Sequence, residues 1–161
     1  MSFFTSFDSY KTTRINASSA KVFIVLKRVE QWPNWDVDLE RVELSTPPTA
    51  PLNETKGTLH MKNYGGGQHP FAIQNVVENS NLEYQCKLPG VISDWYWTWK
   101  ETEDGHVDMK MGVRVHGGAA LLWRAALAPF LGGALDACLK NLKSLAEEGK
   151  VDGKDLSHLY Q

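Results

Sequence analysis

The chain has 161 residues, and its 17 Lys and Arg residues against 19 Asp and Glu residues give a formal net charge of −2. A chain of this size fits one domain and buries about 70% of the surface its unfolded form exposes, which leaves room for a core with a pocket. The balanced charge provides no excess of cations to hold a phosphate backbone, so nucleic acid is excluded as an expected partner.

The N-terminal segment MSFFTSFDSYK has neither the basic start nor the apolar run of a signal peptide. No continuous apolar segment approaches the ~20 residues that span a bilayer, so we expect a soluble cytoplasmic protein and no integral membrane partner. Cys86 and Cys138 show no C-x-x-C spacing, and both fall on apolar faces. Buried, reduced thiols are therefore expected rather than a disulfide, in keeping with a reducing cytosol.

Residues 15–44, INASSAKVFIVLKRVEQWPNWDVDLERVEL, read as a strand end, a helix, a sharp aromatic turn and a second strand. Ser18 or Ser19 can cap the helix, and apolar residues then follow at helical spacing. Pro33, inside the Trp32 to Trp35 turn, stops the helix because it has no N–H and disfavours helical geometry at the residue before it. We expect Trp32 and Trp35 to wedge the short helices against the sheet.

Strand-like runs separated by turn chemistry recur along the chain. The seven predicted strands are Ser9 to Asn16, Leu39 to Ser45, Gly57 to Lys62, His69 to Glu78, Leu82 to Leu88, Asp94 to Thr102 and His106 to His116. Short turns join most of them, which predicts an antiparallel sheet. The Pro-rich segment 45–51 is expected to be a surface loop, and Gly65, Gly66 and Gly67 a flexible hairpin tip.

From Ala119 to Glu148 the apolar period changes from two to 3.6, which predicts an amphipathic helix of some 30 residues, roughly 45 Å long. The stripe consists of Leu131, Leu135, Cys138, Leu142 and Leu145. A kink is expected at Pro129, because its ring clashes with the carbonyl of Ala125. Residues 151–161 are polar and are expected to be poorly ordered.

This order of elements, the WPNW turn, the hairpin WTWKETEDGHVDMKMGVRVHG and the proline-containing helix RAALAPFLGGALDACLKNLKSLAEE resemble the START-like (SRPBCC, birch-pollen-allergen-like) superfamily. Within it the chain resembles the polyketide cyclase/dehydrase and lipid-transport family over nearly its whole length. The expected fold is an α+β helix-grip, in which a seven-stranded curved antiparallel sheet wraps around a long C-terminal helix. Two short helices lie between strands 1 and 2. Residues 1–149 would form a single ligand-binding domain, and residues 150–161 a polar C-terminal tail.

Strand alternation predicts which side chains face the helix. Trp95, Trp97 and Trp99 share one face and lie opposite a strand containing Met109 and Met111, and these flat, polarizable side chains would suit an apolar ligand. The resemblance implies a cleft there, of several hundred Å³ on the scale of typical sites. The predicted lining is Phe71, Ile73, Asn75, Tyr84, Trp95, Trp97, Trp99, Met109, Met111, Arg124 and Leu131.

Two alternatives remain open for these aromatic residues. The tryptophans can simply be core, since a domain of this size must fill its interior. Tyr96 makes both faces of the strand aromatic, and if it faced inward the exposed tryptophans would suggest a dimer interface. Val77 is also assigned to the inward face, whereas His60 is expected to point outward.

Polar groups on the inward faces are a second clue, because leaving one unpaired costs on the order of 1–3 kcal/mol. Asn75 and Tyr84 either pair internally or await a ligand. Arg124 lies within about 20° of the inward stripe. It either snorkels to the rim or presents its guanidinium to an anionic or phenolic group.

Signatures of metal, phosphate and nucleophilic sites are absent from the sequence. The histidines, His60, His69, His106, His116 and His158, show neither H-x-H nor H-E-x-x-H spacing, so no metal or other cofactor is expected. His69 could overlook the pocket mouth or be a solvated loop residue.

The first functional hypothesis is a carrier or sensor of a small hydrophobic molecule, aromatic or polyketide-like, held between sheet and helix. The second, which the resemblance permits, is a cyclase/dehydratase-type enzyme with Tyr84, Asn75, His69 or Arg124 moving protons. The third is a protein-interaction module with a filled core. We expect a monomer or a weak homodimer.

Overall fold

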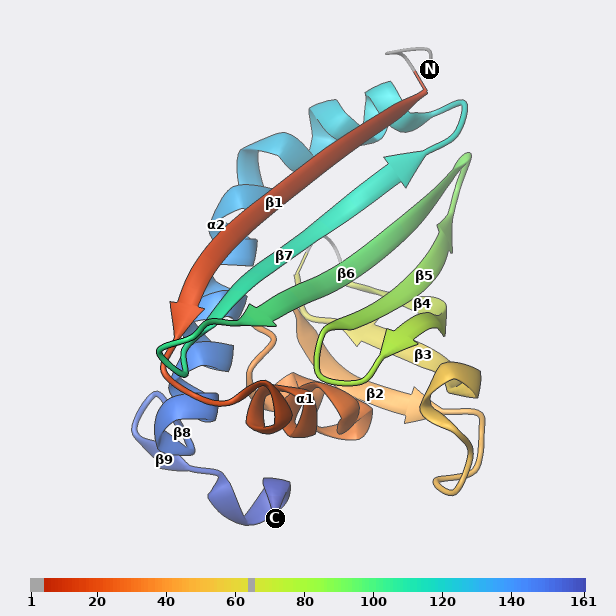
Figure 1. Ribbon diagram of the computed structural model, residues 1–161. Coiled ribbons are helices and arrows are strands. Elements are labelled where there is room, and N and C mark those ends of the chain that lie inside the picture. The colour runs from red at the N-terminus through yellow and green to blue at the C-terminus, as the bar shows by residue number, and fades with distance from the viewer. Residues whose placement is uncertain (1–4, 64–65) are drawn as a thin grey trace.

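The computed structural model describes residues 5–63 and 66–161, so Gly65 of the predicted hairpin tip lies outside the described residues. The chain forms a helix-grip: one curved antiparallel sheet wraps around one long helix, and short helices close the lower end (Figure 1). Both the predicted fold class and the sheet direction are confirmed.

All seven predicted strands are present, and the sheet order is β1-β7-β6-β5-β4-β3-β2. Every neighbouring pair is antiparallel. The strands are β1 (Ser6–Ile15), β2 (Leu39–Leu44), β3 (Lys56–Met61), β4 (Gly67–Val77), β5 (Asn81–Leu88), β6 (Val91–Glu101) and β7 (Val107–His116).

Two short helices lie between β1 and β2, as predicted: α1 (Ser19–Lys27) and the 3₁₀ helix η1 (Val29–Asn34). Ser18 caps α1, since its Oγ accepts a hydrogen bond from the Lys21 backbone N–H at 3.2 Å. The Trp32 indole N–H donates to the Leu26 carbonyl at 2.8 Å, which ties the aromatic turn back to the end of α1.

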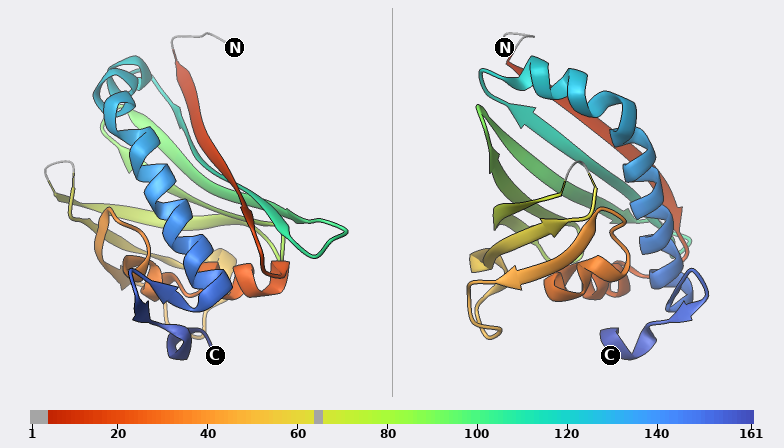
Figure 2. Two further views of the ribbon diagram at one scale, coloured as in Figure 1. Left: turned by 90° about the vertical axis from the view of Figure 1, so that its left-hand side faces the viewer. Right: turned by 180° about the vertical axis from the view of Figure 1, so that it is seen from behind.

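The long helix α2 (Ala120–Glu148) contains Pro129, and it bends along its length (Figure 2). The predicted inward stripe is buried, and the helix packs mainly on β1. We expected no segment apolar enough to cross a bilayer. By length and composition alone, α2 is nevertheless long and apolar enough to do so, because its charged residues are few and widely spaced. Its C-terminal half, however, packs in the core through Leu135, Leu142 and Leu145.

The end of the chain is ordered, so the expectation of a poorly ordered tail was wrong. It forms β8 (Lys150–Val151), β9 (Lys154–Asp155) and the 3₁₀ helix η3 (Ser157–Tyr160), and another short 3₁₀ helix, η2 (Leu52–Glu54), precedes β3. Val151 and Leu156 are buried against the core, and the Leu156 N–H donates to the Gly149 carbonyl at 2.8 Å. Leu159 and Tyr160 also pack against the core, so apolar contacts hold this mostly polar segment in place.

A bulge in β4 corrects the prediction for Asn75 and Val77. The β4–β5 register shifts between Ile73 and Asn75, which leaves Gln74 as an extra residue. A bulge turns the side chains beyond it to the other face. Asn75 and Val77 are therefore exposed, while Val76 turns inward opposite the buried Leu82.

His60 points outward, as predicted, but its side chain is buried on that face. Its Nε2 lies 3.2 Å from Oε2 of Glu43, an exposed residue on β2. Arg41 pairs with the other oxygen of that carboxylate at 2.8 Å. This ion pair on the neighbouring strand lies beside the imidazole and shields it.

Candidate functional site

The lower interior is filled by an aromatic cluster formed by Trp32, Trp35, Phe71, Tyr84 and Trp97. The Trp32 ring centroid lies 5.2 Å from that of Tyr84 and 5.4 Å from that of Trp97. Trp97 also meets the edge of Trp35 at 5.9 Å and is only 1% exposed. The turn and the sheet thus build a dense wall, in which Trp32 and Trp35 have the predicted wedging position.

Trp95 lies at the open margin of this cluster. Its ring stacks on Tyr84, with centroids 6.3 Å apart and an interplanar angle of 7°. Unlike Trp97 and Trp99, Trp95 is only partly buried. Aromatic surface is therefore left accessible on the inward face of β6.

Two further inward-facing side chains, one on β3 and one on β4, are partly buried. His69 on β4 is the register partner of Leu59, which is buried and faces inward. It also lies two positions before Phe71, another inward residue, so His69 is on the same face of the sheet. Met61 follows Leu59 on the same face of β3. His69 therefore lies in β4 and at the margin of the inward face, not in a loop.

Tyr96 does not face inward, so β6 is not turned inside out. Its hydroxyl donates to Oδ1 of Asp8 on β1 at 2.9 Å, and its ring covers Gly112 of β7 on the outer face. The tyrosine is nonetheless buried, because the absence of a side chain at Gly112 lets the ring lie flat against the sheet.

The remaining predicted lining residues divide between core and solvent. Arg124 and Asn75 are both exposed; Arg124 reaches water from a position beside the inward stripe, as its snorkelling alternative anticipated. Most of the others are buried in the core: Phe71, Ile73, Trp97, Trp99, Met109, Met111 and Leu131. Among the four polar candidates, only Tyr84 is buried in the interior, and His69 lies at its margin.

The structure adds a buried carboxyl group that the sequence analysis missed. Asp36 follows the WPNW turn, and its Oδ1 accepts hydrogen bonds from the Asp38 N–H at 3.0 Å and the Cys138 thiol at 3.5 Å. Burial raises its pKa to about 6. The only sequence signal for this site was an acidic residue immediately after an aromatic turn. With this pKa, Asp36 titrates near neutral pH, and its carboxyl group contacts Cys138 of α2.

Other titratable groups in the interior are held neutral. Burial raises the pKa of the Tyr84 hydroxyl well above its ordinary value. Burial likewise raises the pKa of Cys86 to about 12 and that of Cys138 still further. Both cysteines are free and buried, as expected, and such thiols are poor nucleophiles.

Three indole N–H groups in the described residues are buried without an acceptor: those of Trp35, Trp97 and Trp99. The indoles of Trp32 and Trp123, by contrast, donate to backbone carbonyls. An unpaired buried donor costs about 1–3 kcal/mol. The interior thus holds donors that an oxygen-bearing molecule could satisfy.

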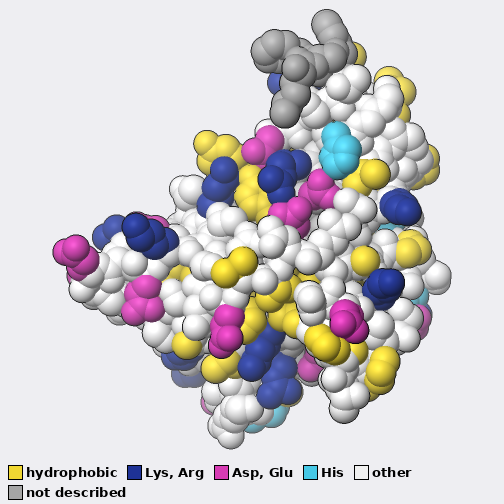
Figure 3. Space-filling model, turned by 45° about the vertical axis from the view of Figure 1, so that its right-hand side comes forward, with side chains coloured by type: hydrophobic (Ala, Val, Ile, Leu, Met, Phe, Trp, Pro, Cys, Tyr) yellow, Lys and Arg dark blue, Asp and Glu magenta, His cyan; other side chains and the backbone are white. Residues whose placement is uncertain are grey.

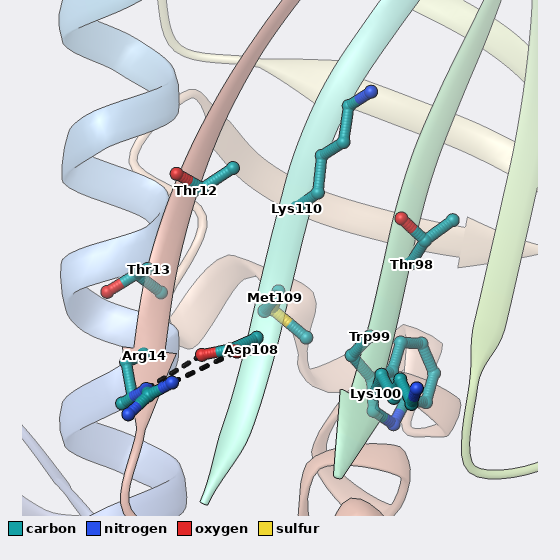
Figure 4. A pocket seen from close by; sticks show the side chains of 9 residues that line it. All are labelled: Thr12, Thr13, Arg14, Thr98, Trp99, Lys100, Asp108, Met109 and Lys110. Carbon is teal, nitrogen blue, oxygen red and sulfur yellow. Dashed lines mark hydrogen bonds and ion pairs between the residues drawn. The ribbon is translucent and has the colours of Figure 1, made fainter. Parts of the chain in front are cut away.

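Two surface pockets lie away from this inward face. The larger, about 590 Å³, is an open depression on the outer face of β1, β7 and β6, where Arg14 pairs with Asp108 (Figure 4). Figure 3 shows that basic and acidic side chains lie close together on the charged outer surface. The smaller pocket, about 200 Å³, lies between α1, the end of α2 and η3. In the described part of the chain, no cluster of three or more His, Cys, Asp or Glu side chains could hold a metal ion.

A family model described as polyketide cyclase / dehydrase and lipid transport matches residues 6–147. The chain therefore belongs to this family, and its fold is a helix-grip that binds hydrophobic ligands. No curated protein matches the chain.

Solved structures share the fold at low sequence identity. The di-domain aromatase/cyclase StfQ of the steffimycin biosynthetic pathway superposes with a TM-score of 0.72 at 16% identity, covering 89% of this chain and 51% of that one. A START superfamily protein from Mycobacterium smegmatis gives 0.69 at 13% identity, over 89% and 99% of the two chains. The Zhui aromatase/cyclase from a Streptomyces species also gives 0.69 at 13%, over 91% and 99%.

Proposed function

We propose that residues 1–149 form a cytoplasmic carrier or sensor domain for a small hydrophobic molecule that contains at least one oxygen acceptor. The molecule would lie between α2 and the inward face of the sheet, against Trp95. The partial exposure of the Trp95 ring, stacked on Tyr84 beside a fully packed aromatic wall, carries this proposal.

The chemistry of the surrounding side chains supports a ligand that is apolar but not a plain hydrocarbon. Trp95 and Met61 offer a flat and a polarizable surface, while His69 supplies a polar group at the margin. Inside, the unpaired indoles of Trp35 and Trp97 can donate to a carbonyl or hydroxyl oxygen. Aromatic or polyketide-like molecules combine both features.

A second candidate function is proton-transfer catalysis of the cyclase or dehydratase kind. It is favoured by Asp36, whose pKa of about 6 lets it accept and return a proton near neutral pH. Tyr84, kept protonated by burial, would act as a hydrogen-bond donor in the same interior.

Native mass spectrometry of the protein purified from its own host tests the binding proposal. A co-purified small molecule, lost on denaturation, is the expected result. If no molecule co-purifies and no aromatic ligand raises the melting temperature, the interior is a filled core and the chain is an interaction module.

A further inference from the structure

The first turns of α2 have an apolar surface on the side turned away from the sheet. Arg124 is the only charged residue between Ala119 and Leu135. The exposed apolar residues of these turns form what we call the outward apolar face: Leu121, Leu122, Ala125, Ala126, Ala128, Pro129 and Phe130.

The side chains of this face are largely exposed within the described residues. Leu121, Leu122 and Phe130 are 53%, 74% and 58% exposed, and the alanines and the proline among them are exposed as well. In Figure 2, seen from behind, no other described element lies over these turns. A surface helix normally turns charged residues to water, so an apolar outer side indicates that something covers it.

The other half of the same helix shows the usual pattern. Asp136, Lys140 and Glu148 are all exposed there. The change from an apolar to a charged exposed surface therefore occurs within one continuous helix, between Phe130 and Asp136. This confines the surface to be covered to about ten residues, roughly 15 Å of helix.

The small size of the face argues against a second protein chain as its occupant. Two such segments crossing each other would bury roughly a few hundred Å² on each side, against about 800 Å² per partner in a stable interface. The face also has no charged or hydrogen-bonding side chain of its own with which to specify a partner. A lipid surface requires neither shape complementarity nor such groups, and its interface admits apolar side chains to a depth of about 5–10 Å.

Two neighbouring contacts suit this occupant. The Trp123 indole donates to the Pro89 carbonyl at 3.0 Å, which fixes the start of α2 to the β5–β6 turn, so the face is held as part of the rigid body. Arg124 is exposed on the same turns of α2, and a long basic side chain of this kind can reach lipid phosphates.

We propose that the chain docks on the surface of a lipid bilayer through the outward apolar face of α2. The docking is peripheral, because the C-terminal half of the helix remains in the core. Apolar burial drives it, since the net charge of −2 provides no attraction to anionic lipid. Neutral vesicles should therefore suffice.

Flotation of the full chain with unilamellar phosphatidylcholine vesicles tests this proposal. Leu121→Glu combined with Leu122→Glu should lower the vesicle-bound fraction at least about tenfold. Lys140→Glu is the matched control, because it makes the same change of −2 in net charge on the exposed outer side of the other half, and it should change binding less than twofold. Adding phosphatidylglycerol or salt should also change binding less than twofold, and near-UV circular dichroism checks that both variants fold.

Failure of the wild-type chain to float with phosphatidylcholine, or equal losses in the two variants, would overturn the proposal. So would a dimer in analytical ultracentrifugation that Leu121→Glu with Leu122→Glu dissociates while vesicles bind neither protein, because the face would then join two copies of the chain. The outcome is independent of ligand binding, which can be followed in the same variants by tryptophan fluorescence.

Discussion

The Cys138 thiol on α2 lies 3.5 Å from Oδ1 of Asp36, and so a group on the long helix contacts a buried carboxyl group in the segment between β1 and β2. The contact joins two parts of the chain 102 positions apart. It places a titratable acid in an interior otherwise lined by aromatic and aliphatic side chains. Several properties of the protein should depend on that acid.

Asp36 should make the stability of the fold fall as the pH rises. Its pKa is about 6 in the native state and 3.8 ordinarily, so between about pH 4 and pH 6 the native state keeps a proton that the unfolded state loses. This contribution is fully present below pH 4 and is lost above pH 6; its size is about 2–3 kcal/mol. Asp36→Asn removes the dependence, and its stability relative to wild type should be about 2–3 kcal/mol more favourable at pH 8 than at pH 4.

Urea unfolding of both proteins at the two pH values measures this difference. The asparagine can still accept hydrogen bonds from Asp38 and Cys138, so the change isolates the charge. A stability difference between the proteins that is the same at pH 4 and pH 8 would contradict a raised pKa.

Trp95 should matter more for ligand binding than its neighbour Tyr96. Trp95→Ala removes the accessible inward ring and should weaken binding of an aromatic ligand at least about tenfold. Tyr96→Ala should leave affinity within about twofold, although it lowers stability by removing the bond to Asp8. Fluorescence titration and ligand-induced melting shifts report both. The inward assignment of Trp95 would be refuted by a larger affinity loss at Tyr96.

Substitutions of inward and of exposed polar residues test whether the protein is an enzyme or a carrier. If the protein is a cyclase or dehydratase, Asp36→Asn should depress turnover of a polyketide-like substrate about 10²-fold or more while binding survives. Tyr84→Phe in a carrier should alter affinity alone. Asn75→Ala and Arg124→Ala are the controls, since both side chains are exposed, and neither should change affinity or turnover by more than about twofold. If Asp36→Asn forms product as fast as the wild type, then Asp36 takes no part in the reaction.

Gly112 should tolerate no side chain. A Cβ there would lie 2.6 Å from the Tyr96 hydroxyl and 2.7 Å from the Ser9 carbonyl, so Gly112→Ala should destabilise the fold by about 1–3 kcal/mol. Gly118→Ala provides the comparison, because nothing lies within 4 Å of its Cβ position. Chemical denaturation measures both. Equal stabilities for the two variants would mean that Tyr96 does not lie against Gly112.

Both thiols should resist a disulfide-exchange reagent in the native protein. Burial raises the pKa of Cys86 to about 12, and Cys138 is likewise held protonated, so almost no thiolate exists at pH 8. Reaction with a chromogenic disulfide should therefore be slow until urea unfolds the chain, and then release two equivalents of thiol. Rapid labelling of either cysteine in buffer would show that the interior opens.

Periodicity along the chain predicted most of the fold. Alternation placed Trp95, Trp97 and Trp99 on the inward side, and the 3.6-residue period marked the buried stripe of α2, because one face of each element had to leave water. The WPNW turn and the proline-containing helix indicated the family, which the family model confirms. These features are local, and so one sequence suffices to read them.

The predictions that were wrong concern residues whose positions depend on contacts with another strand or with the core. The bulge at Gln74 changes no residue type, yet it reverses the side on which Asn75 lies. Ordering of the C-terminal segment likewise depends on contacts of Val151 and Leu156 with the core.

By itself the sequence determined the succession of strands and the helix stripe, since these follow from periods of two and 3.6 and from turn chemistry. It also indicated the class of ligand-binding fold, through its resemblance to a known family. The tertiary structure alone decided which polar groups lie inside, because burial of Asp36 and exposure of Arg124 depend on what packs against them. It alone also showed that no other element of the described residues lies over the outward side of the first turns of α2. A period can identify the apolar residues of a helix, but whether water reaches them depends on atoms distant in the chain.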